Sequence, residues 1–129
     1  MSMPIKKLNK KNHRKKVLAI DFDGVIHRYS RGWRDGSIYD RPMVGSRMAL
    51  TALRRKFEII IFSHRAVHQG TKKIREWLKI QKIPYDRVTT EKPRARWYID
   101  DRAIRFTTWS KTLKEISRLE KNYPFKNRK

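Results

Sequence analysis

The chain has 129 residues, which is the size of a single domain and is enough to bury a hydrophobic core. Lys and Arg number 34 against 12 acids, so the net charge is 34 − 12 = +22 with His neutral, and the chain attracts polyanions. The absence of cysteine excludes disulfides, thiolate metal sites and a cysteine nucleophile, and it fits a reducing compartment.

The start of the chain is strongly basic. The first 16 residues hold seven Lys and Arg and no acid, which indicates a flexible basic arm over residues 1–15 or, equally well, a solvated tail. Residues 16–22, KVLAIDF, form a short apolar run that ends in acids, which predicts a buried strand. Asp21 ends the run too early for a signal peptide or a membrane span, so we expect a cytoplasmic protein that does not bind membranes.

The middle of the chain alternates predicted loops, helices and strands. Three glycines and a proline make residues 23–43 a loop, with room for a short hairpin. Apolar residues at helical spacing predict helices over residues 44–56 and 67–81, the second with Val67 and Trp77 on its buried stripe. Residues 57–62, FEIIIF, predict the second strand.

Two strands and a helix complete the predicted domain, which ends at residue 120. Residues 87–89 and 95–99 predict strands, and the second, ARWYI, places Trp97 and Tyr98 in the core. A helix over residues 109–120 has an apolar stripe that we expect to face inward, formed by Trp109, Leu113, Ile116 and Leu119. Residues 121–129 form a second basic tail.

Strands separated by helices predict right-handed βαβ units. We therefore expect an α/β fold over residues 16–120, a single-domain, Rossmann-like parallel sheet with helices on both faces. In such sheets ligands bind beyond the carboxyl ends of the strands. Polar side chains follow three of the four predicted strands at that edge: Asp21, Asp23, Ser63, Asp100 and Asp101.

These residue types together indicate phosphate chemistry. Carboxylates without His or Cys are hard oxygen ligands that favour Mg²⁺, so we predict a metal site from Asp21, Asp23, Asp100 and Asp101. An aspartate near Mg²⁺ and a lysine can attack phosphorus, and a second carboxylate two residues on can protonate the leaving oxygen and then activate water. Ser63 can donate to a phosphate oxygen, and Lys92 can neutralise it. These parts constitute a phosphomonoesterase.

Four segments resemble, in order, the motifs of the haloacid dehalogenase (HAD) superfamily of phosphohydrolases. They are VLAIDFDG at residues 17–24, IIIFS at 59–63, Lys92 in Glu-Lys-Pro, and WYIDD at 97–101. The resemblance covers residues 16–105 and implies a HAD-like domain. Because neither interval between the motifs can hold a sizeable cap domain, we expect a small, capless member with an open site.

The resemblance also implies a role for each residue. Asp21 is similar to the nucleophile and a metal ligand, and Asp23 to the general acid/base, with its backbone carbonyl on the metal. Ser63 and Lys92 would hold the phosphoryl group. Asp100 would ligate Mg²⁺, directly or through water, and Asp101 would support the site. The substrate-binding residues that we expect are Gly24, Ser63, His64, Arg65 and Lys92, although Arg65 is equally compatible with a solvated loop position.

The leading interpretation is a Mg²⁺-dependent phosphatase that hydrolyses a phosphomonoester through an aspartyl phosphate. The charge, and the basic and aromatic residues between His27 and Arg34, suggest a nucleotide or a nucleic-acid end as substrate. Two alternatives stay open: a nucleic-acid-binding module on an inactive HAD scaffold, and a sugar- or metabolite-phosphate phosphatase. The sequence does not indicate an oligomeric state.

Overall fold

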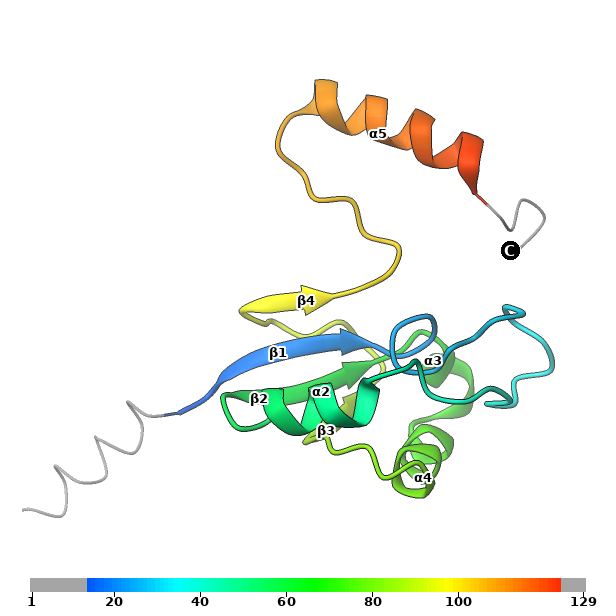
Figure 1. Cartoon of the computed structure of the whole chain (residues 1–129), viewed down its shortest axis with the longest axis vertical. Helices are drawn as coiled ribbons and strands as arrows, with labels where there is room; N and C mark the ends of the chain where they lie inside the picture. Colours follow the sequence, from blue (N-terminus) through cyan, green and yellow to red (C-terminus); the bar gives the residue numbers. More distant parts are fainter. Residues whose placement is uncertain (1–13, 124–129) are drawn as a thin grey trace, which may run out of the picture.

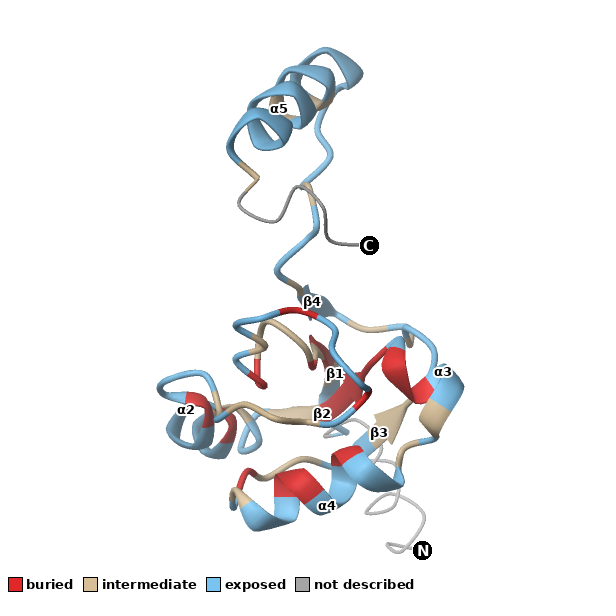
Figure 2. Ribbon diagram, turned by 90° about the vertical axis from the view of Figure 1, so that its right-hand side faces the viewer, coloured by how far each residue is buried: buried red, intermediate tan, exposed pale blue. Residues whose placement is uncertain are grey.

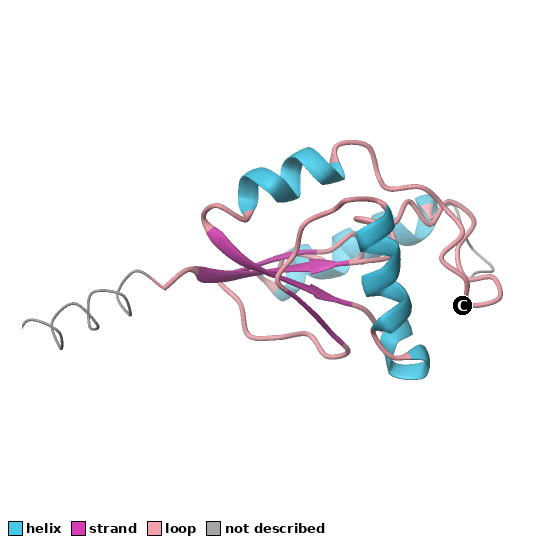
Figure 3. Ribbon diagram, turned by 90° about the horizontal axis from the view of Figure 1, so that it is seen from below, coloured by secondary structure: helices cyan, strands magenta, loops and turns pink. Residues whose placement is uncertain are grey.

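A four-stranded parallel sheet organises the computed structural model, which describes residues 14–123. Its order is β3-β2-β1-β4, and each of the three pairings is parallel. The strands are β1 (Lys16–Asp21), β2 (Phe57–Phe62), β3 (Arg87–Thr89) and β4 (Trp97–Ile99). Seen from below, they fan out with the twist expected of a parallel sheet (Figure 3). The predicted α/β class and parallel sheet are confirmed.

The described residues also form four helices: α2 (Ser46–Leu53), α3 (Arg65–Gln69), α4 (Lys72–Ile80) and α5 (Trp109–Asn122). The single helix predicted over residues 67–81 is wrong, because Gly70 has a φ of 74° and separates α3 from α4. Val67 therefore leaves the predicted stripe and is 56% exposed. Trp77 is buried as predicted, and its ring meets Phe22 edge-on at 5.3 Å between centroids.

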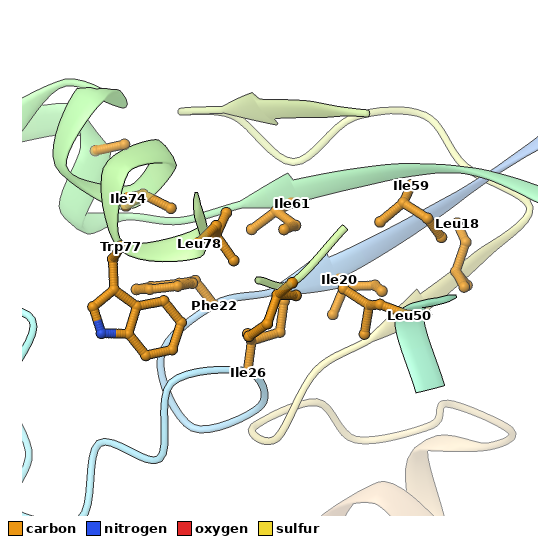
Figure 4. Packing of buried hydrophobic residues seen from close by; sticks show 12 residues of the cluster. Leu18, Ile20, Phe22, Ile26, Leu50, Ile59, Ile61, Ile74, Trp77 and Leu78 are labelled. Carbon is orange, nitrogen blue, oxygen red and sulfur yellow. The ribbon is translucent and has the colours of Figure 1, made fainter. Parts of the chain in front are cut away.

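The core lies on one face of the sheet. Alternate side chains of β1 and β2 point toward α2, α3 and α4, which are the helices that contribute to this cluster (Figure 4). The labelled side chains are Leu18, Ile20, Phe22, Ile26, Leu50, Ile59, Ile61, Ile74, Trp77 and Leu78. Since all these groups lose water together, this face supplies most of the hydrophobic stabilisation of the described residues.

Among residues 14–123, the expected helices on both faces are not found, because α5 does not pack on the sheet. Residues 100–108 carry α5 away from β4, and the helix stands apart from the other elements (Figure 1). No residue of α5 is buried (Figure 2). The predicted inward stripe is therefore wrong: its Trp109 and Leu113 are 69% and 62% exposed. Trp97 and Tyr98 are exposed too, since β4 is an edge strand without a covering helix.

The predicted basic arm over residues 1–15 lies outside the described residues except for its last two, Arg14 and Lys15. Of the predicted tail over residues 121–129, the first two belong to α5, and residues 124–129 lie outside the described part. Within residues 14–123 no helix is long and apolar enough to span a bilayer.

Substitution of one leucine on α4 and one on α5 tests whether α4 belongs to the core while α5 stays exposed. Leu78 of α4 is fully buried, so Leu78→Ala should lower the free energy of unfolding by about 2–5 kcal/mol. Leu113→Ala on α5 should change it by no more than about 0.5 kcal/mol. Denaturant unfolding of both variants measures the difference. Equal losses would mean that α5 is packed in solution.

Candidate active site

A pocket of about 410 Å³ opens at the carboxyl ends of β1 and β2. Asp21 ends β1, and its register partner Phe62 ends β2, so Ser63 lies one position beyond the residue that pairs with Asp21. Among the side chains that line the pocket are Asp21, Asp23, Tyr29, Ser63, Arg65 and Arg102. The sheet edge thus brings together the residues that the sequence predicted there.

Three carboxylates form a cluster at this edge. Asp21, Asp100 and Asp101 each offer one oxygen, and these oxygens lie within 4.8 Å of one another. The strand register explains their meeting, because Ile20 pairs with Ile99 and the next residues are Asp21 and Asp100. Three hard oxygen ligands within this distance are suitable for a divalent cation such as Mg²⁺.

Gly24 makes room for the third carboxylate. Its φ is 89°, a left-handed value that side chains disfavour, and a Cβ at this position would overlap the side chain of Asp101. Two physical constraints therefore favour glycine at position 24: the backbone turn that follows β1, and the close approach of the Asp101 side chain. Gly24 belongs to the site through this approach.

The environment of Asp21 disfavours its charge. Burial, and then the negative charge of Asp100, raise the pKa of Asp21 to about 7. The backbone N–H of Phe22, which donates to Asp21 Oδ1 at 2.9 Å, lowers the pKa, whereas Asp101 and Asp23 raise it further. A bound cation would offset this repulsion, so the three carboxylates could hold a divalent metal ion.

Asp23 has the opposite environment although it is two residues away. Burial would raise its pKa, but hydrogen bonds from His27 and Arg65, together with the charge of Arg65, lower the pKa overall. Arg65 donates from Nε to Asp23 Oδ2 at 2.9 Å and from Nη2 to Oδ1 at 3.1 Å. Both carboxylate oxygens are thus engaged by a fork of two donors. The Asp23 side chain is not a member of the three-carboxylate cluster.

His27 adds a third donor to Asp23. Its ring is fully buried, and Nδ1 lies 2.8 Å from Asp23 Oδ1. The backbone N–H of Asp40 donates to His27 Nε2 at 3.0 Å. Because Nε2 accepts, the neutral ring carries its hydrogen on Nδ1 and donates it to Asp23. Asp23 therefore faces donors on both oxygens, which favours the carboxylate form.

Arg65 also holds the loop over residues 28–42 against the site. Its Nη1 donates to the carbonyl of Gly36 at 2.9 Å, and Gln69 Nε2 donates to the same carbonyl at 2.9 Å. The guanidinium lies over the rings of Trp33 and Tyr29, at 5.0 and 5.9 Å from their centroids. One buried side chain thus fixes both Asp23 and the aromatic loop.

The remaining predicted residues have different positions. Ser63 is buried and lines the pocket, and His64 lines it too, with its ring 5.7 Å from that of His68. The solvated alternative for Arg65 is wrong, because its side chain is buried. Lys92 is exposed outside the lining of this pocket, and its Nζ lies over the ring of Tyr98, 4.6 Å from the centroid.

Sequence reasoning missed two features. His27 has no periodic signal, although its spacing of four residues from Asp23 allows a contact across the turn. The pairing of Arg65 with Asp23 joins positions 42 residues apart, and only the parallel arrangement of β1 and β2 brings them together. The one available hint is a basic residue two positions after Ser63, just beyond the strand that pairs with β1.

No protein-family model, curated protein or solved structure matches this chain. The resemblance to the HAD superfamily therefore remains an expectation that depends on the four motifs.

The raised pKa of Asp21 predicts that this residue makes the folded protein less stable as pH rises. Between pH of about 4 and 7 the unfolded chain has released this proton and the folded protein retains it, so the free energy of unfolding decreases as pH rises. In chelator, Asp21→Asn should melt at a higher temperature than the wild type at pH 8, and the difference should shrink toward pH 4.

Asp35→Asn is the matched control, because Asp35 is exposed and its hydrogen bonds with Ser37 lower its pKa. This variant should not gain stability relative to the wild type as pH rises. A pH-independent difference between Asp21→Asn and the wild type would contradict the unfavourable environment of Asp21.

Proposed function

We propose that the protein is a Mg²⁺-dependent phosphomonoesterase that works through an aspartyl phosphate on Asp21. One observation carries the proposal: the Asp21 carboxylate belongs to the three-carboxylate cluster and also lines the pocket beside Ser63. A phosphate ester in that pocket would meet a nucleophile, a hydroxyl donor and a cation site at once. The described residues between the strands add loops and helices but no further domain, so the pocket is accessible to large substrates.

Asp21, Asp100 and Asp101 would hold the metal. Bound Mg²⁺ would neutralise part of the negative charge of the phosphoryl group and of the carboxylates. It would also keep Asp21 ionised at neutral pH, because a bound cation favours the charged carboxylate against burial and against the negative charges of Asp100 and Asp101, which raise its pKa.

In the first step Asp21 attacks phosphorus, the bond to the ester oxygen breaks, and that oxygen leaves with the electron pair. Ser63 would donate to a phosphoryl oxygen. Lys92 lies near this edge, with its Nζ 5.8 Å from the ring centroid of Phe62, and would turn from the rings toward the phosphoryl group. Arg102, which lines the pocket, supplies a second positive charge.

In the second step a water molecule attacks the aspartyl phosphate, and Asp23 accepts its proton. Donors from Arg65 and His27 keep Asp23 ionised, which is the form that a base needs. The same donors disfavour the protonated form that would assist the leaving oxygen in the first step. The proposal therefore implies faster turnover of esters with good leaving groups.

The nucleophile is tested by Asp21→Asn. Without the carboxylate no aspartyl phosphate can form, so hydrolysis of p-nitrophenyl phosphate with Mg²⁺ should fall to background. Circular dichroism serves as the control for folding. Full activity in this variant would disprove the assigned role of Asp21.

The base is tested by Asp23→Asn in a rapid-mixing experiment with p-nitrophenyl phosphate. Attack should still occur, but hydrolysis of the aspartyl phosphate should slow by about 10²- to 10⁴-fold. The time course of product release should show a burst of one equivalent of nitrophenol per protein, followed by slow turnover. Loss of the burst in a folded variant would mean that Asp23 acts before the intermediate forms.

A further inference from the structure

We propose that residues 102–111, which lead from the pocket into the first turn of α5, form a binding surface for single-stranded nucleic acid, whose phosphorylated end lies in the pocket. The position of the end depends on the proposed phosphatase function, whereas the binding surface is supported by separate observations. Apart from Arg102 at its start, the segment has no role in the chemistry described above, and none of its residues belongs to the core cluster.

The segment begins inside the site. Arg102 lines the pocket together with Asp21, and its backbone N–H donates to Asp100 Oδ1 at 2.9 Å. The carboxylate cluster thereby fixes the start of the segment. From there the chain leads outward to α5, as Figure 1 shows. A single-stranded nucleic acid bound along this segment would therefore run from the pocket to the exposed helix.

Two aromatic rings lie along this path. Phe106 and Trp109 are 56% and 69% exposed, and their rings meet at 5.2 Å between centroids with planes 69° apart. Neither ring belongs to the core cluster. Exposed aromatic faces on a basic surface allow bases of a single strand to stack without selection of sequence.

The positive charge of the segment favours a polyanion as its binding partner over another protein or an uncharged molecule. Residues 102–111 contain three basic residues and no acid, namely Arg102, Arg105 and Lys111, and Lys114 follows them on α5. All four are exposed. The first turn of α5 also lacks an acid, so the positive end of the helix dipole adds to this charge. With a net charge of +22, a second copy of the chain would be repelled.

Fluorescence anisotropy in chelator measures binding without turnover. The probe is a labelled single-stranded oligonucleotide of about 12 nucleotides, within the range of known single-strand sites, with a terminal phosphate. Trp109→Ala should weaken binding by roughly 5- to 150-fold, the effect of losing one stacked base. Trp109→Phe should restore most of the affinity. Arg105→Gln should reduce the slope of log affinity against log salt by about 0.7.

Two matched variants control for general effects. Leu113→Ala removes an exposed apolar side chain one turn further along α5, and Lys79→Gln removes an exposed charge from α4. Both should bind the oligonucleotide nearly as the wild type does. Equal losses in Leu113→Ala and Trp109→Ala would overturn the proposal, since the helix would then dock through its apolar stripe. Equal losses of heparin and oligonucleotide binding in Trp109→Ala would also overturn it, because heparin has no bases.

Hydrolysis of p-nitrophenyl phosphate by the wild-type protein separates the two proposals. Binding that depends on Trp109, without hydrolysis of any phosphate, would support the surface and overturn the phosphatase. Hydrolysis together with oligonucleotide binding that Trp109→Ala leaves unchanged would overturn the surface and leave the phosphatase standing.

Discussion

The ion pair between the buried Arg65 and the half-buried Asp23 joins the parts of the site. Arg65 lies at the start of α3, Asp23 lies just beyond β1, and the same guanidinium holds the carbonyl of Gly36 in the aromatic loop. A buried guanidinium is costly unless its donors are satisfied, and removal of one partner of such a pair typically costs about 3–5 kcal/mol. The loop, the helix and the end of the strand are therefore held in one arrangement.

This pair also divides the carboxylates into two groups with different chemistry. Asp21 lies with Asp100 and Asp101, where burial and like charges raise its pKa. Asp23 turns toward Arg65 and His27, which lower its pKa. Two titratable groups whose environments shift their pKa values in opposite directions are suited to separate roles. The assignment of nucleophile and base that the sequence motif suggested agrees with that division.

The sequence best predicted the features that depend on local patterns of residues, such as the strands and the residues at their ends. FEIIIF and KVLAID are apolar runs bounded by polar residues, and their strands pair in parallel with their carboxyl ends side by side. Prediction from the sequence failed for features that depend on contacts between residues far apart in the chain. An apolar stripe indicates which face of α5 is hydrophobic, but whether anything covers that face depends on the path of residues 100–108. The partners of Arg65 and the ring stacked under Lys92 depend on the fold in the same way.

The central claim is that Asp21, Asp100 and Asp101 bind Mg²⁺ while the side chain of Asp23 stays with Arg65. Calorimetric titration with Mg²⁺ at pH 8 tests it most directly, with Asp101→Asn and Asp23→Asn compared against the wild type. The account predicts one site in the wild type, clearly weaker binding in Asp101→Asn, and binding close to wild type in Asp23→Asn. Loss of binding in Asp23→Asn alone, with Asp101→Asn unaffected, would contradict it.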